Sequence, residues 1–113
     1  MRLWKIKVRR FINRTYLYLL GYKFVESAIT YFNENGTLVE VTGKRHPDCL
    51  KTIQQRGQTD LYKQWYEDGF TIKIRSGFGF SAPLFISREN ATILCKKHRV
   101  KLIGAVLTSE DLW

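Results

Sequence analysis

The sequence has few cysteines and no long apolar run. Two cysteines are too few for a disulfide scaffold and are typical of a reducing compartment, so we expect a cytoplasmic protein. No segment approaches the roughly 18 consecutive apolar residues of a transmembrane helix. Asn13 and Arg14 interrupt the first apolar stretch, which a signal peptide would need unbroken. We therefore expect no transmembrane segment and no secretory leader.

Motifs for common enzyme chemistry are also missing. The chain has no phosphate-binding Gly-x-x-x-x-Gly-Lys-Ser/Thr loop, no Gly-x-Ser-x-Gly elbow and no His-Glu-x-x-His pair. Its adjacent carboxylates, Glu67-Asp68 and Glu110-Asp111, are typical of polar helix ends or tails. The sequence favours a protein that is not an enzyme and has no cofactor.

Acidic residues are few, and they are unevenly distributed along the chain. The chain has 19 Lys and Arg against 10 Asp and Glu, a net charge of +9. Residues 1–25 contain no acid at all, and residues 73–113 are again mainly basic. Such a charge favours polyanionic partners, among which nucleic acid is the most common.

With 113 residues, 44% of them hydrophobic, the chain predicts a single domain over residues 1–113. Asn35-Gly36 between two alternating segments predicts a β-hairpin. Capping residues and periodicity predict the remaining elements. They are helices at 45–57, 59–69 and 88–98, and strands at 27–33, 37–43, 70–76, 77–87 and 100–107.

Residues 1–25 form a basic amphipathic segment that we expect to pack on this domain. Read as a helix after a short strand or irregular entry, it places apolar residues on one stripe: Trp4, Val8, Phe11, Ile12 and Leu19. The apolar side would dock on the domain while the bases follow a phosphate backbone. Two alternatives remain, an anionic membrane surface and a solvated charged face.

The predicted fold class is α+β, with a mainly antiparallel sheet, one β-hairpin and two or three helices. From residue 37 onward the order is strand, helical region, strand, strand, helix, strand, which a ferredoxin-like βαββαβ arrangement would share. In this order and in Gly77-Phe78-Gly79-Phe80 the chain resembles RNA recognition motif domains. The resemblance implies that Phe78 and Phe80 share one sheet face and stack bases. The other interpretation is that the glycines open a hairpin and both phenylalanines pack in the core. Ser76 and Pro83 depart from the motif.

These features predict a module that binds nucleic acid, RNA or single-stranded DNA in preference to duplex. Phe78 and Phe80 would stack bases, and the phosphates would be held by Lys5, Lys7, Arg9, Arg10, Arg14, Lys73, Arg75, Lys96, Lys97, Arg99 and Lys101. The alternative is a protein-interaction module, an inhibitor or accessory subunit that adds a strand at an exposed hairpin edge around Ile29 to Phe32. Its partner would be an acidic protein or a ribonucleoprotein.

The histidines and cysteines form two mirrored pairs, His46 with Cys49 and Cys95 with His98. Four such ligands in two close pairs suit a structural zinc ion. Both cysteines also fall on apolar stripes, so the other interpretation is that they are core residues. A third hypothesis gives His46 and His98 acid and base roles in metal-free RNA cleavage, with neighbouring bases stabilising the transition state.

Overall fold

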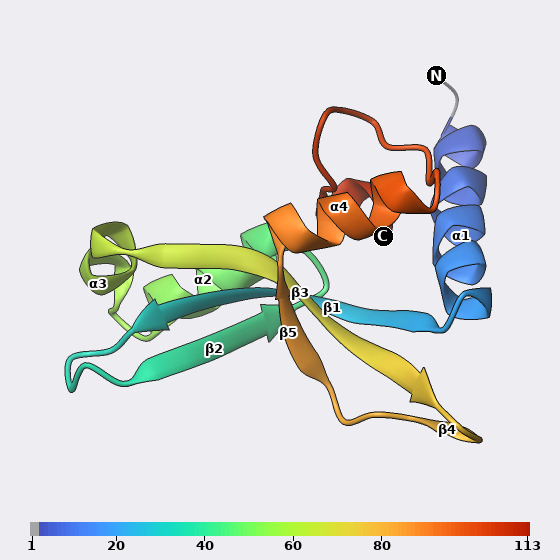
Figure 1. The fold of residues 1–113 in the computed structure, drawn as a ribbon. Helices are drawn as coiled ribbons and strands as arrows, with labels where there is room; N and C mark the ends of the chain where they lie inside the picture. Colours follow the sequence, from blue (N-terminus) through green and yellow to red (C-terminus); the bar gives the residue numbers. More distant parts are fainter. Residues whose placement is uncertain (1–2) are drawn as a thin grey trace.

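Two eleven-residue strands, β1 (Tyr22–Phe32) and β3 (Tyr66–Ser76), pair antiparallel and form the centre of the fold (Figure 1). In the computed structural model, which describes residues 3–113, β2 (Leu38–Gly43) pairs with β1 on its other side. The strands β4 (Gly79–Phe80) and β5 (Leu84–Ser87) both pair with β3. All pairings are antiparallel, and the main order is β2-β1-β3-β4.

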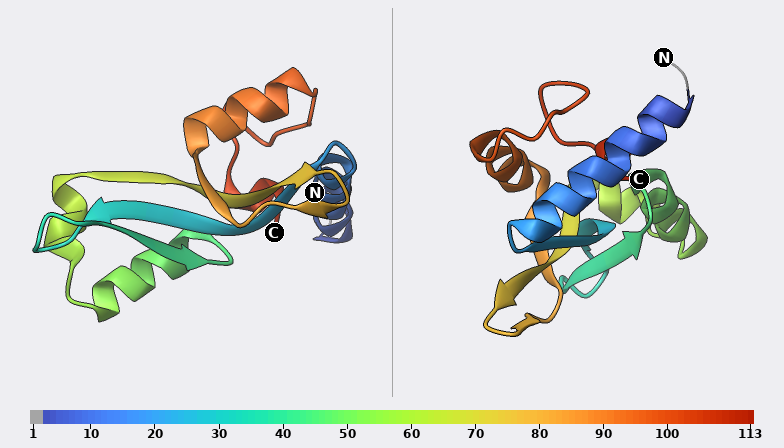
Figure 2. Two further views of the ribbon diagram at one scale, coloured as in Figure 1. Left: turned by 60° about the horizontal axis from the view of Figure 1, so that its bottom comes forward. Right: turned by 90° about the vertical axis from the view of Figure 1, so that its right-hand side faces the viewer.

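The sheet is curled into a half-barrel (Figure 2). A register shift between Phe24 and Glu26 marks a β-bulge in β1, and bulges bend and twist a strand. At Gly69 the backbone of β5 approaches closely, since a Cβ there would lie 2.0 Å from the carbonyl oxygen of Ile86. Gly69 therefore permits this close crossing of β3 and β5.

The helices are α1 (Leu3–Leu19), α2 (His46–Gln55), α3 (Thr59–Gln64) and α4 (Arg88–Lys97), followed by a 3-10 helix, η1 (Ser109–Asp111). From Leu3 onward the chain is helical where a short strand or irregular entry was expected, and residues 1–2 lie outside the described residues. No helix within residues 3–113 is both long enough and apolar enough to cross a bilayer. The observed class is the α+β fold predicted from the sequence.

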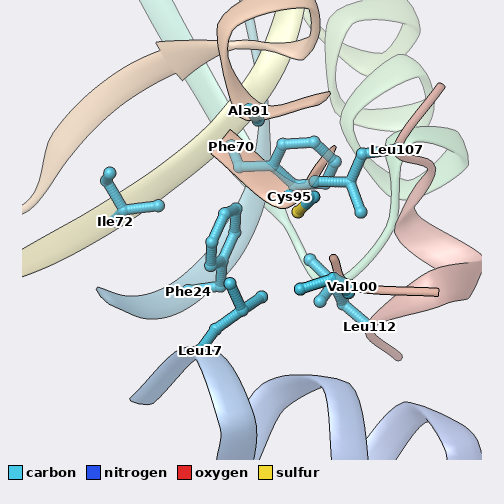
Figure 3. Close-up of a cluster of buried hydrophobic side chains, with 9 residues drawn as sticks. All are labelled: Leu17, Phe24, Phe70, Ile72, Ala91, Cys95, Val100, Leu107 and Leu112. Carbon is cyan, nitrogen blue, oxygen red and sulfur yellow. The ribbon is translucent and has the colours of Figure 1, made fainter. Parts of the chain in front are cut away.

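The core has two parts. The first core lies between the sheet, α1, α4 and the C-terminal segment (Figure 3), and its buried residues are Leu17, Phe24, Phe70, Ile72, Ala91, Cys95, Val100, Leu107 and Leu112. The second core lies beneath α2 and contains Ile29, Tyr31, Val41, Cys49 and Ile53. The edge-on ring contact between His46 and Phe70, with centroids 5.2 Å apart, lies between the two.

Elements with strong local signals form where the sequence predicted them. Gly36 adopts a positive φ of 72° in the β1–β2 turn, and the Asn33 side chain accepts hydrogen bonds from the backbone of Asn35 and Thr37. The helix α2 has a proline in its first turn, as expected. The Ser87 hydroxyl accepts a hydrogen bond from the Asn90 backbone and caps α4.

Three predicted elements are wrong in whole or in part. The strand expected at 77–87 is divided into β4 and β5, with Gly77 and Phe78 in a turn before β4. The helix expected to reach Gly69 ends at Gln64, because residues 66–69 pair with β1 as the first part of β3. Residues 100–107 form no strand and run irregularly. Asp111 holds this segment instead, since its carboxylate accepts hydrogen bonds from the backbone of Ile103 and Thr108 at 2.7 and 2.9 Å.

The ferredoxin-like order is consequently not formed, because its last strand is missing and β1 occupies the middle of the sheet. The expected exposed edge at Ile29 to Phe32 is also wrong. These residues belong to β1 and lie between β2 and β3, so this side of the sheet ends at β2.

Candidate functional site

The helix α1 packs on the domain through a partly polar face. Asn13 is 5% exposed, and its side-chain amide donates to the backbone carbonyls of Lys101 and Asp111 at 3.2 and 3.1 Å. Arg10 donates to the carbonyl of Glu110 at 2.8 Å, and Leu17 is fully buried. These contacts satisfy backbone oxygens of the irregular C-terminal segment, which has no strand partner to do so.

The apolar stripe of α1 faces solvent, against the expectation that it docks on the domain. Trp4, Val8, Phe11, Ile12 and Leu19 are all exposed, Phe11 to 61%. Rotation of the helix to bury them would remove Asn13 from its two carbonyl partners, and unpaired buried carbonyls are costly. The stripe thus divides the exposed surface of α1 into two flanks.

One flank carries a groove, here called the α1 groove, with a volume of about 720 Å³. Its apolar lining comes from Trp4, Val8, Ile12 and Tyr16 on α1 and from Val100 on the opposite wall. The two walls are joined where the Tyr16 hydroxyl donates to the carbonyl of His98 at 3.1 Å. A direct hydrogen bond therefore connects the two walls of the groove at this end.

The rims of the α1 groove are basic on both walls. Lys5 and Arg9 come from α1, Arg99 and Lys101 come from the segment after α4, and no acidic side chain lines the groove. Arg99 has a positive φ of 58° at the end of α4, where the Val100 amide donates to the carbonyl of Cys95. Arg99 thus ends the helix in the left-handed backbone conformation, which redirects the chain. Arg99 and Lys101 both line the wall of the groove opposite α1.

At the C-terminal end of α1, the opposite flank meets the β3–β4 hairpin. The Arg75 guanidinium donates to the carbonyl of Tyr18 at 2.9 Å and to that of Leu19 at 3.4 Å. It also lies 5.8 Å from the Tyr18 ring and 5.6 Å from the Phe80 ring. Arg75 thus caps the helix end, and the Tyr18 and Phe80 rings, 5.4 Å apart, pack the hairpin against it.

Phe78 and Phe80 have different environments. Gly77, with φ of 62°, and Phe78 form the two-residue turn between the paired Ser76 and Gly79, and glycine is the residue that a type II′ turn requires first. Phe80 is partly buried against α1, whereas Phe78 is fully exposed at the tip. Of these two phenylalanines, therefore, only Phe78 presents a free ring to solvent.

Two lysines of the sheet stand directly opposite each other beside this hairpin. Lys23 of β1 is the register partner of Lys73 of β3, a like-charge pair that disfavours the strand pairing. Lys23 also lines a hollow of about 290 Å³ with Arg14 and Tyr18. Within residues 3–113 the one ion pair is Arg88 with Asp68, so neither lysine is neutralised. We call Arg14, Tyr18, Lys23, Lys73 and Phe78 the hairpin flank.

The other basic residues predicted to hold phosphates, Lys7, Lys96 and Lys97, line neither the α1 groove nor the hollow beside Lys23. Lys7 is exposed on α1. Lys96 and Lys97 are exposed in the last turn of α4, where positive charge complements the helix dipole. The predicted phosphate-binding set is therefore not one continuous patch: Arg10 and Arg75 hold backbone carbonyls, and the others are distributed over the two flanks of α1 and the end of α4.

The four candidate metal ligands are not brought together. Cys95 belongs to the first core and Cys49 to the second. Among the described residues, no three His, Cys, Asp or Glu side chains lie close enough to share a metal ion. Burial raises the pKa of the Cys49 thiol to about 11 and that of Cys95 to about 12, so both are protonated at neutral pH.

His46 has hydrogen-bond partners at both ring nitrogens. Its Nε2 lies 2.7 Å from the carbonyl oxygen of Gly69, and its Nδ1 lies 3.2 Å from the Arg88 guanidinium. Burial lowers the pKa of His46, so the neutral ring donates through Nε2 and accepts at Nδ1. His98, the other suggested catalytic histidine, instead lies beside Tyr22, with ring centroids 5.9 Å apart.

Comparison with known proteins adds no family assignment. No protein-family model matches the chain, and no curated protein or solved structure matches it either.

The sequence analysis did not identify the α1 groove or the role of Lys23. The groove depends on a contact between Asn13 and Lys101, which are far apart in the sequence. Lys23 becomes notable only through its register with Lys73. The glycine before Phe78, by contrast, was a local signal of a turn.

Proposed function

We propose that the protein binds single-stranded nucleic acid, RNA or DNA, at the hairpin flank. The observation that carries the proposal is Phe78, a fully exposed ring at the tip of the β3–β4 hairpin, whose strand β3 also carries Lys73 opposite Lys23. A free aromatic ring stacks on an unpaired base whatever its identity, and the lysines hold the neighbouring phosphates.

The positive charges of this flank support the same proposal. Lys23 and Lys73 repel each other across the strands, and a phosphate placed between them would remove that repulsion. Arg14 faces the hollow that Lys23 also lines, which extends the positive surface toward α1. Tyr18, 43% exposed, adds a second ring next to it.

The first test is binding of a fluorescein-labelled single strand by anisotropy across a salt series. Phe78→Ala is expected to weaken binding about 5- to 150-fold, the range that corresponds to roughly 1–3 kcal/mol of stacking. Its free energy of unfolding should not change, because the ring contacts solvent. The matched control is Phe32→Ala, an exposed aromatic of β1 close to the β1–β2 turn, which should leave binding intact.

The charge contribution has its own measurement. Lys73→Ala is expected to reduce the slope of log affinity against log salt by about one phosphate contact. Lys63→Ala removes the same charge from α3 and should change the slope far less. If Lys73→Ala and Lys63→Ala reduced the salt slope equally, and Phe78→Ala left the affinity unchanged, the net charge of the protein alone would explain the binding.

A further inference from the structure

The α1 groove lies on the other flank and has a composition that the proposed function does not explain. Trp4 and Tyr16 supply rings near its two ends, but Val8, Ile12 and Val100 between them are aliphatic and offer no flat ring for a base. Val100 is buried, but the exposure of Val8 and Ile12 to solvent, maintained by the hydrogen bonds of Asn13, is unfavourable unless something covers them. We propose that the α1 groove binds an amphipathic helix of a partner protein, one with an apolar stripe flanked by acidic residues.

Charge complementarity identifies the partner's chemistry. Both rims are basic, with Lys5 and Arg9 on one wall and Arg99 and Lys101 on the other. A helix lying between the walls would meet positive charge on both sides of its buried stripe. Acidic residues at these flanking positions pair with the rims, whereas basic ones are repelled.

The shape of the surface favours a helix over a bilayer. The apolar side chains line a hollow between two walls, and the hydroxyl of Tyr16 keeps the walls together. Side chains of a helix can fill such a hollow, while a flat lipid surface would leave it empty and lose those contacts. Trp4 and Tyr16 are twelve residues apart on α1, or about 18 Å at 1.5 Å per residue, which matches about three turns of a partner helix.

The probe is a labelled peptide of about 18 residues, long enough to form helix, with leucines at helical spacing and glutamates on both sides of them. Its control is a scrambled peptide of identical composition in which the leucines form no stripe. Anisotropy is expected to show at least about tenfold tighter binding of the patterned peptide. Equal binding of the two peptides would overturn the proposal, since charge alone would then explain it.

Two matched variants locate the site. Ile12→Glu places a charge in the groove and should weaken the patterned peptide at least about tenfold. Ile93→Glu on α4 introduces the same charge at a residue of similar exposure, 58% against 56%, and should have little effect. A circular-dichroism melt of both variants separates a binding loss from a folding loss. Equal weakening by the two folded variants would contradict the groove as the site.

Charge reversal tests the rims. Lys5→Glu combined with Lys101→Glu should weaken the acidic peptide and strengthen a version in which lysines replace the glutamates. Vesicles of phosphatidylglycerol and phosphatidylcholine, and a single-stranded oligonucleotide, are titrated in parallel. Two results together would overturn the proposal. The native protein would fail to bind the peptide, and Ile12→Glu would abolish binding of the vesicles or of the oligonucleotide, which would show that the groove binds one of those instead.

Discussion

The helices α1 and α2 each have an apolar stripe, but α2 turns its stripe toward the domain whereas α1 turns its stripe toward solvent. The α2 helix buries Cys49 and Ile53 against the sheet, together with His46 at its first turn, and leaves most of its other polar residues in water. The α1 helix turns Asn13 inward and leaves Trp4, Phe11 and Ile12 exposed. An apolar stripe therefore predicts an amphipathic helix, but it does not predict whether the stripe packs on the helix's own domain or is exposed to a partner.

The difference has a local cause. The chain beside α2 consists of paired strands, so the helix packs mainly by burying Cys49 and Ile53, and His46 also donates to the carbonyl of Gly69. The chain beside α1 is the irregular segment after α4, whose carbonyls need donors. A buried polar group without a partner costs about 1–3 kcal/mol. Turning the stripe inward would leave the two carbonyls that Asn13 binds without their donor and would expose Leu17, which is now fully buried.

The largest expected contrast is between two isoleucines. Ile53→Ala in α2 should lower the free energy of unfolding by about 2–5 kcal/mol, because it leaves a cavity in the second core. Ile12→Ala in α1 should change it by less than about 0.5 kcal/mol. Urea denaturation measures both. A comparable loss at Ile12 would mean that the stripe of α1 is buried in solution.

A smaller effect is expected at the inward face of α1. Asn13→Ala should destabilise the domain by about 1–3 kcal/mol, because the carbonyls of Lys101 and Asp111 lose their donor. Thr15→Ala, an exposed neighbour, is the control. If Asn13→Leu were more stable than the native chain, apolar burial and not hydrogen bonding would decide the orientation of α1.

The smallest expected effect is a pH dependence of the free energy of unfolding, caused by His46 on the packed face of α2. His46 is neutral when folded because burial lowers its pKa, and unfolding returns the pKa to about 6.5. Below that pH the unfolded chain binds a proton that the folded chain does not, so stability falls until the folded pKa is reached. Urea denaturation between about pH 7.5 and 5.5 should show this decline, and His46→Gln should reduce it. An unchanged decline in His46→Gln would assign it to another group.

Local features of the sequence were sufficient for several elements. The turn at Asn35-Gly36, the proline of α2 and the Ser87 cap act within a few residues, so their predictions are confirmed. The boundary between α3 and β3 depends on pairing with β1, which competes with helix continuation. The path of residues 100–107 depends on Asp111 and α1, which no local pattern could reveal.

The same division applies to the candidate sites. The turn that contains Phe78 begins at Gly77, a local signal, but the exposure of the Phe78 ring is a result of the tertiary structure. The positions of Arg10 and Arg75 on backbone carbonyls, and the pairing of Lys23 with Lys73, depend on tertiary contacts. A count of basic residues therefore overestimates how many of them are free to hold phosphate.

The most direct test of the two-flank arrangement titrates one labelled single strand and one labelled acidic helical peptide against two variants. Phe78→Ala should weaken only the oligonucleotide, and Ile12→Glu should weaken only the peptide. Saturation with peptide should leave the oligonucleotide affinity within about twofold, as expected for separate sites. If each variant weakened both ligands, or if the ligands displaced one another, the flanks would form a single surface and the account would be contradicted.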